Sequence, residues 1–281
     1  MWNIGLSTCG KTVDEELFRQ YAEAGITDME VSVGYLDLQM DLPSVKRWAD
    51  AYGIRLWTYH LPFAPFEEID ISALDASLRN TSLEHLTAHI RLAAEIGIKN
   101  YVIHPSGEPY VPEEREERLC RAAECLHILA DRAAEYGGRI LVEDLPRTCL
   151  GRDSGEILRL IKADDRLMVC FDTNHLLTED PAAFVQAVGD RIVSLHVSDY
   201  DFLNERHWMP GEGKVDWSTL VASLCAVGYD GPWLYEIEFA CPDTILRDRE
   251  LTCRDFAVNA DEVLGGKPIT TIARHMDNLG K

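Results

Sequence analysis

Hydrophobic and polar positions follow a repeated order along the chain, in which a short apolar run precedes a longer amphipathic run. The short runs predict eight β-strands, with bounds 3–7, 26–33, 54–60, 99–104, 139–143, 167–172, 191–198 and 233–236. The amphipathic runs predict eight helices, at 14–24, 43–52, 78–96, 112–136, 154–162, 181–188, 216–227 and 243–264. Several of these helices stop at a glycine, such as Gly25, Gly53 and Gly97, which is a common residue just past a helix end.

Eight strands alternating with eight helices in 281 residues predict an α/β fold, a (β/α)8 TIM barrel that forms a single domain over residues 1–281. An open doubly wound sheet is the alternative. No G-x-G-x-x-G motif follows the first strand, which removes the usual dinucleotide-binding motif of such a sheet. Residues 199–215 are expected to be irregular. Residues 265–281 lack a clear strand or barrel helix and are expected to form a peripheral tail.

Composition narrows the class of protein. No run of about 18 apolar residues exists, so no membrane span is predicted. No basic region precedes the first apolar residues, which argues against a secretory signal. The eight cysteines form no C-x-x-C pair and are expected to be reduced thiols in a cytoplasmic protein. The net charge is 27 − 48 = −21, which argues against nucleic acid and anionic membranes as partners.

Charged residues stand at the ends of the predicted strands. The sixth strand ends in Asp172, and His175 follows three residues later. A buried strand has no packing use for a charge at its tip, so this carboxylate needs a partner. Other strand ends carry His60, His104, Glu143, His196 and Glu236, and the loop after the seventh strand carries Glu205 and His207. Glu30 lies inside the second strand and is less well placed. Because barrel active sites lie at the carboxyl ends of the strands, these side chains are candidates for one site.

Four of these residues come from consecutive strands and can converge on one metal ion: Glu143, Asp172, His196 and Glu236. Such a mixed oxygen and nitrogen set suits Mn²⁺, Zn²⁺, Co²⁺ or Fe²⁺ better than Ca²⁺. His175 lies beyond its strand and can reach either substrate or metal. The other histidines lie in predicted helices or the tail and are expected to be surface or packing residues: His85, His89, His127 and His275.

Further residues near the predicted rim have two readings each. Aromatic residues of the third strand and the loop after it can line a sugar pocket or pack the barrel: Trp57, Tyr59, Phe63 and Phe66. Basic residues on the rim loops can hold an anionic group or lie solvated on the surface: Arg147, Arg152, Arg206 and Lys214.

The second half of the chain resembles the xylose isomerase-like TIM barrel superfamily, which includes sugar and sugar-phosphate isomerases and epimerases and the endonuclease IV enzymes. The matching segments are 141–144, 171–175, 195–199, 206–217 and 235–238. Together the D-x-x-H and H-x-x-P-G-x-G segments are fairly specific to the superfamily, and none is specific to a substrate. Asp144 is a departure, since the superfamily often has Asn there.

The resemblance implies a divalent metal held by Glu143, Asp172, His196 and Glu236, with Glu143 and Glu236 also acting as the acid/base pair. Mn²⁺, Zn²⁺ or Co²⁺ is expected, with one ion per chain favoured and up to three allowed. Substrate contacts are expected from His60, His104, His175, Arg206 and His207.

The sequence therefore predicts a metal-dependent isomerase or epimerase acting on a sugar or sugar phosphate. The reaction removes a proton next to a carbonyl through a metal-stabilised enediolate. The partner is a small sugar or sugar derivative, and a homo-oligomer is compatible with the sequence.

Three alternatives stay open. One is a zinc phosphodiesterase of the endonuclease IV type, since eight of the rim residues resemble that group's ligands for three zinc ions. The charge of −21 weighs against it, because a DNA-repair enzyme must hold a polyanion. The second is a dehydratase acting on a cyclitol or keto sugar, and the third is a binding protein without activity.

Overall fold

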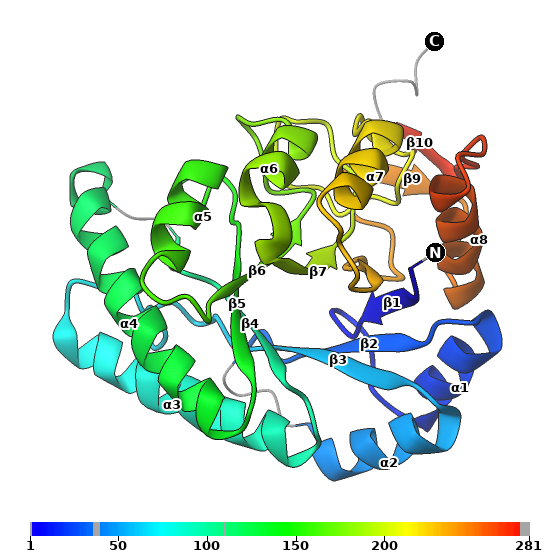
Figure 1. Cartoon of the computed structure of the whole chain (residues 1–281). Coiled ribbons are helices and arrows are strands. Elements are labelled where there is room, and N and C mark those ends of the chain that lie inside the picture. The colour runs from blue at the N-terminus through cyan, green and yellow to red at the C-terminus, as the bar shows by residue number, and fades with distance from the viewer. Residues whose placement is uncertain (1, 36–39, 109–110, 276–281) are drawn as a thin grey trace.

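Parallel strands follow one another around a barrel in sequence order in the computed structural model, which describes residues 2–35, 40–108 and 111–275 (Figure 1). The barrel strands are β1 (Ile4–Ser7), β2 (Asp28–Ser32), β3 (Arg55–His60), β4 (Asn100–Ile103), β5 (Arg139–Glu143), β6 (Met168–Asp172), β7 (Ile192–His196) and β8 (Trp233–Tyr235). β1 pairs with both β2 and β8. The barrel closes where the Val197 amide donates to the Leu234 carbonyl at 2.8 Å. The predicted TIM barrel is confirmed.

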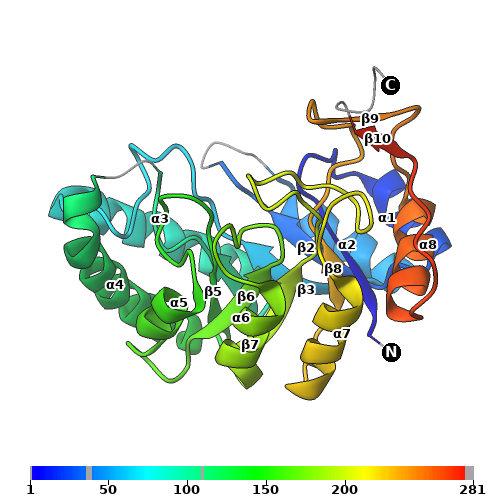
Figure 2. The same ribbon diagram turned by 90° about the horizontal axis from the view of Figure 1, so that it is seen from above.

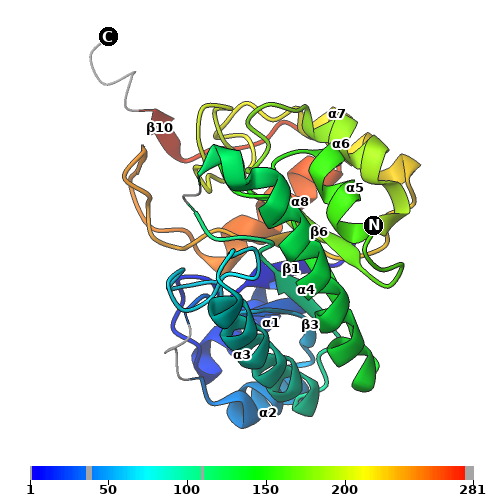
Figure 3. The ribbon, with the colours of Figure 1, turned by 90° about the vertical axis from the view of Figure 1, so that its left-hand side faces the viewer.

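Helices surround the strands on the outside, as Figures 1 and 3 show from two sides. They are α1 (Glu15–Ala24), α2 (Leu42–Tyr52), α3 (Ala76–Glu95), α4 (Arg115–Glu135), α5 (Ser154–Ile161), α6 (Pro181–Val188), α7 (Trp217–Ala226) and α8 (Cys253–Leu264). An aspartate caps the first turn of most of them by accepting a backbone N–H: Asp14, Asp41, Asp75, Asp153, Asp180 and Asp216. Such caps satisfy amides that have no partner inside the helix.

Alternation along the strands separates an apolar layer from a polar layer inside the barrel. Residues two apart on a strand point to the same side, so Leu141 lies below Glu143 and Cys170 lies below Asp172. Leu141 and Cys170 belong to a small buried cluster with Val102 and Val193. The polar residues at the strand ends therefore stand on an apolar floor that excludes water from beneath the site.

The end of the chain differs from the prediction. Residues 243–252 do not belong to the last helix, which begins at Cys253. They include β9 (Ile245–Arg247), which pairs antiparallel with β10 (Ala273–His275), so the prediction that 265–281 lacks a strand is wrong. Two contacts hold β9 in place: Ile245 is buried, and Arg247 makes a buried ion pair with Glu212 at 2.7 Å. Figure 2 shows β9 and β10 beside each other at one edge of the molecule.

Two expectations from composition are met in the described residues. All eight cysteines are free thiols. Among the helices that the structure describes, none combines the length and apolar character needed to cross a membrane.

Candidate active site

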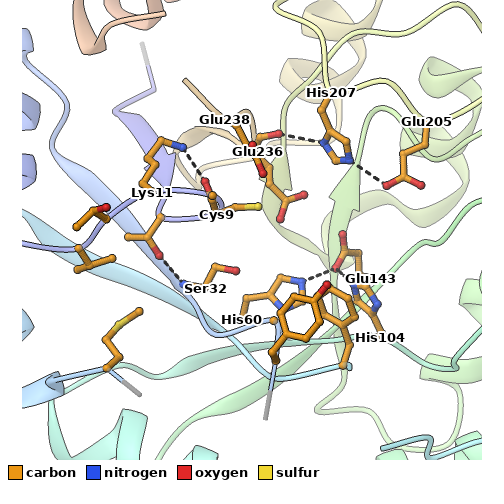
Figure 4. A pocket seen from close by; sticks show the side chains of 18 of the residues that line it. Cys9, Lys11, Ser32, His60, His104, Glu143, Glu205, His207, Glu236 and Glu238 are labelled. Atoms are coloured by element: carbon orange, nitrogen blue, oxygen red, sulfur yellow. Dashed lines mark hydrogen bonds and ion pairs between the residues drawn. The ribbon is translucent and has the colours of Figure 1, made fainter. Parts of the chain in front are cut away.

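A cavity of about 780 Å³ opens at the carboxyl ends of the strands (Figure 4). Its walls include residues that the sequence singled out: His60, Phe63, His104, Glu143, His175, Glu205, His207 and Glu236. Residues 8–13 after β1 and Glu238 after β8 also line the cavity. The strand ends therefore meet in one place, as their positions in a barrel predict.

The four predicted metal ligands lie together at the base of this cavity. Ligand atoms of Glu143, Asp172, His196 and Glu236 all lie within 4.8 Å of one another. His196 Nδ1 is 2.9 Å from Glu143 Oε1, 3.4 Å from Glu236 Oε2 and 3.9 Å from Asp172 Oδ2. All four side chains are buried.

The surroundings of Asp172 show that these four residues suit a bound cation. Its Oδ1 accepts the Asn174 amide at 2.7 Å, whereas its buried Oδ2 has no hydrogen-bond partner in the part of the chain that the structure describes. Burial and the neighbouring Glu236 raise the pKa of Asp172 to about 6. A buried carboxylate oxygen that faces other carboxylates needs a positive charge. The donor set of three carboxylates and one imidazole fits a divalent transition metal.

Two histidines hold the far oxygen of Glu143. Nε2 of His60 and Nε2 of His104 lie 3.1 Å and 3.2 Å from Glu143 Oε2. Burial alone would raise the pKa of Glu143, but His196 and His104 hold it well below its usual range. Phe63 stacks on the His104 ring, with centroids 4.2 Å apart, and so fixes that ring. Glu143 is therefore ionised and tightly oriented.

A second group of side chains lies beside the first, since His175 Nε2 is 3.6 Å from Asp172 Oδ2. Glu205 Oε1 lies 2.9 Å from His207 Nε2 and 3.5 Å from His175 Nε2. Nδ1 of His207 faces the Glu236 carbonyl oxygen at 3.1 Å, and Nδ1 of His175 faces the Asp144 carbonyl oxygen at 2.8 Å. Burial lowers the pKa of His207, but Glu205, Glu236 and Asp172 together raise it, to about 9. His175 and His207 are thus fixed at one nitrogen by the backbone and face Glu205 with the other.

Asp144, the departure from the superfamily pattern, contacts a predicted metal ligand, Asp172. Its Oδ1 accepts the backbone amide of Asp172 at 2.7 Å, and its Oδ2 has no partner in the described residues. Burial raises the pKa of Asp144 well above its usual value. The side chain therefore links the end of β5 to the end of β6, which is the function that an asparagine would also perform.

Other predicted residues lie away from the cavity. Arg206 is held by Asp201 at 2.8 Å and lines a smaller adjacent hollow of about 290 Å³ with His207, Glu236 and Glu238. Among the aromatic candidates, only Phe63 lines the main cavity in the described residues, while Tyr59 bonds His89 and Trp57 packs inside the barrel. His89 is thus a packing residue, as expected. Arg147 pairs with Glu108 and Glu205.

Some wall residues were not among the sequence candidates. Lys11 is one: its Nζ donates to the carbonyls of Ile237 at 2.7 Å and Cys9 at 3.1 Å, and burial lowers its pKa to about 8. Figure 4 shows Lys11 and Cys9 across the cavity from Glu143. Two features of the sequence could have indicated these wall residues: the polar run 7–12 at the end of the first predicted strand, and Glu238, which lies two residues after Glu236.

The sequence of the chain is similar to those of known proteins. Residues 18–252 match the model of the family described as xylose isomerase-like TIM barrel. An inosose dehydratase of Lacticaseibacillus casei is 30% identical over 272 residues, covering 84% of this chain and 89% of that protein. A fructoselysine 3-epimerase of Shigella flexneri is 25% identical over 243 residues, covering 81% of this chain and 87% of that protein.

Other matches are shorter or rest on shape. An uncharacterised protein of Methanocaldococcus jannaschii is 29% identical over 181 residues, and the match spans 60% of this chain and 60% of that protein's length. A structure of D-psicose 3-epimerase in the presence of D-fructose superposes with a TM-score of 0.78, over 95% of this chain and 100% of that chain. With 19% sequence identity, this superposition shows a shared fold alone.

Proposed function

The chain belongs to the xylose isomerase-like TIM barrel family, and we propose that it is a divalent-metal-dependent enzyme that epimerises or isomerises a sugar next to its carbonyl group. The observation that carries the proposal is the convergence of Glu143, Asp172, His196 and Glu236, with a buried carboxylate oxygen of Asp172 left unpaired. The names of the fructoselysine 3-epimerase and the D-psicose 3-epimerase support the same chemistry.

Glu143 and Glu236 are proposed as the acid/base pair. They come from β5 and from the end of β8, three strands apart around the barrel, and reach the same centre. Two carboxylates on different sides of a substrate can remove a proton from one face and return it to the other. The bound ion would polarise the carbonyl group and stabilise the negative charge that develops as the proton leaves.

The histidines around this pair are proposed as substrate contacts. His60, His104, His175 and His207 all line the cavity. Because His175 and His207 face Glu205 with the nitrogen that the backbone does not hold, a substrate hydroxyl or carbonyl oxygen would replace that contact with Glu205. Arg206 stays a prediction, because its guanidinium is paired with Asp201 and lines the adjacent hollow.

The charge of the cavity wall favours an unphosphorylated sugar. Carboxylates of Glu205, Glu238 and Asp41 line the cavity above the proposed metal ligands. Among the described lining residues, Lys11 is the single lysine and there is no arginine. Two of the three donors of Lys11 are taken by backbone carbonyls. A phosphate would enter a negative field without a free cation to meet it.

Replacing each glutamate by glutamine tests the acid/base assignment. Glu143→Gln and Glu236→Gln are each expected to lose at least about a hundredfold in kcat, since general acid or base catalysis contributes on the order of 10²–10⁴. A panel of ketoses and inosose-type compounds in deuterated water reports both product and proton exchange. The metal content of each variant separates loss of the base from loss of the ion, and full rate with normal metal content would refute the assignment.

A zinc phosphodiesterase is the second candidate, and the grouping of the histidines favours it. Besides the four-residue set, His60, His104 and Glu143 form one group that could hold an ion, and His175, Glu205 and His207 form another. Elemental analysis decides between the candidates. Three zinc ions per chain together with cleavage of DNA at abasic sites would replace the sugar proposal, whereas the net charge of −21 opposes binding of a polyanion.

A dehydratase on the same site is favoured by the inosose dehydratase match. It would use the same proton abstraction and then lose a hydroxyl group as water. The ketose and inosose panel distinguishes it, because a dehydratase yields an unsaturated or deoxy product and an epimerase conserves mass.

A further inference from the structure

Glu30 is a charged residue in the interior of a barrel strand. It lies in the middle of β2, and its side chain is fully buried. The described residues place no lysine or arginine in an ion pair with it. Its Oε2 accepts the Thr58 hydroxyl at 2.9 Å and lies 2.9 Å from His196 Nε2, while Oε1 has no hydrogen-bond partner in the described part of the chain. Because burying a carboxylate is costly, its presence needs an explanation.

The explanation lies in the ring that Glu30 contacts. His196 presents Nδ1 to the cluster of Glu143, Asp172 and Glu236, and presents Nε2 to Glu30 on the other side. An imidazole binds a metal through an unprotonated nitrogen, and a hydrogen bond from its other nitrogen fixes the tautomer and the ring plane. Glu30 stands where that second hydrogen bond must be accepted.

We propose that Glu30 is a positioning residue for the metal centre: it accepts the Nε2–H of His196 and so holds the Nδ1 lone pair toward the ion. Thr58 in turn fixes the Glu30 carboxylate from β3. The chain of contacts runs through the barrel interior from β3 through β2 to β7, so the orientation of His196 on β7 depends on strands on the far side. This inference rests on the metal centre of the proposed function.

Metal affinity is the measurement that tests this role. Glu30→Met keeps the side-chain length and removes the acceptor, and it is expected to weaken Mn²⁺ or Zn²⁺ binding by roughly ten- to a hundredfold in calorimetric titration. Glu30→Gln keeps an oxygen that can accept the Nε2–H and is expected to retain most of the affinity. The metal-induced rise in Tm should likewise be much smaller in Glu30→Met than in the wild type, and only slightly smaller in Glu30→Gln.

Asp28 supplies the matched control. It lies on the same strand, is fully buried and is paired with Arg55, and in the described part of the chain it makes no hydrogen bond or ion pair with a proposed metal ligand. Asp28→Asn is therefore expected to lower Tm without changing metal affinity. Equal loss of affinity in Asp28→Asn and Glu30→Met would show that Glu30 acts through general stability and would overturn the positioning role.

Nitrogen NMR of labelled histidine in the Zn²⁺-loaded protein gives an independent readout. His196 is expected to carry its proton on Nε2, and metal contact at Nε2 would overturn the inference. The two levels of proposal also fail separately. If the wild-type chain binds no divalent metal, the proposed function fails. If the wild type binds the metal and Glu30→Met binds it equally well, only the assignment of Glu30 fails.

Discussion

Asp172 shows how a single residue reveals a missing partner. Its backbone position is fixed from both sides, because Asp144 accepts its amide and its own Oδ1 accepts the Asn174 amide. The remaining oxygen cannot turn away and stays buried without a hydrogen bond in the described residues. A fold that holds a carboxylate so firmly in an unfavourable environment gains from it only when a cation is bound.

Without metal, the Asp172→Asn variant is expected to be more stable than the wild type, and the difference is expected to grow as pH rises. The folded-state pKa of Asp172 is raised from 3.8 to about 6, so the folded chain holds a proton that the unfolded chain releases. The wild type therefore loses stability, by at most about 3 kcal/mol, between these two values, and the variant does not. Urea unfolding of both proteins in chelator, across this pH range, measures the difference.

With metal present, the wild type should instead be more stable than the variant. Asp172→Asn removes a charged ligand, so the metal-induced increase in stability is expected to be larger in the wild type. If the variant matched the wild type at every pH with and without metal, Asp172 would be an ordinary buried side chain.

At the scale of elements, the two-stranded sheet of β9 and β10 depends on one buried ion pair. Arg247 and Glu212 have side-chain exposures of 0% and 1%, whereas the nearby pair of Arg274 and Asp248 is exposed at 63% and 79%. Glu212 also accepts the backbone amide of Met209, so the ion pair joins the two-stranded sheet to the loop between β7 and α7. That loop carries Glu205 and His207 of the site.

Arg247→Met is expected to lower the free energy of unfolding by about 3–5 kcal/mol, because it leaves the Glu212 carboxylate buried without its counter-charge. Arg274→Met, on the partner strand, is the control and should change stability little, since exposed ion pairs contribute little. Denaturant unfolding of both variants provides the comparison. Similar losses in the two would contradict the assignment of this contact as the anchor.

Over the whole molecule, net charge and cavity charge have the same sign. The chain carries −21, and Asp41, Glu205 and Glu238 line the cavity. A negative cavity in a negative protein repels anionic substrates during approach as well as in the bound state.

A ketose is therefore expected to have a kcat/KM at least about tenfold higher than the same ketose carrying a terminal phosphate, which corresponds to about 1.4 kcal/mol. Raising the ionic strength should reduce this difference in kcat/KM, because salt screens exposed charges. Glu238→Gln, which neutralises an exposed wall carboxylate, should narrow it as well. Faster turnover of the phosphate would show that a cation beyond those described meets it.

The order of apolar and amphipathic runs predicted the barrel because each strand and helix is set by local periodicity. It also predicted which residues meet, because the carboxyl ends of parallel strands lie together: Asp172 ends β6, Glu236 directly follows β8, and both reach the same centre. The segment 243–252 was wrongly assigned to a helix because its strand is held by contacts with distant residues, Glu212 and the strand Ala273–His275.

The local pattern determined which side chains gather at the rim, and tertiary structure decided what each one touches. Glu30 is the clearest case, since its position inside a strand gave no reason to connect it with His196, which lies 166 residues away. The barrel interior joins the two because strands far apart in the sequence cross one small enclosed space. Hydrogen-bond partners, burial and the unpaired oxygen of Asp172 depend on distances between strands, and these no single stretch of sequence contains.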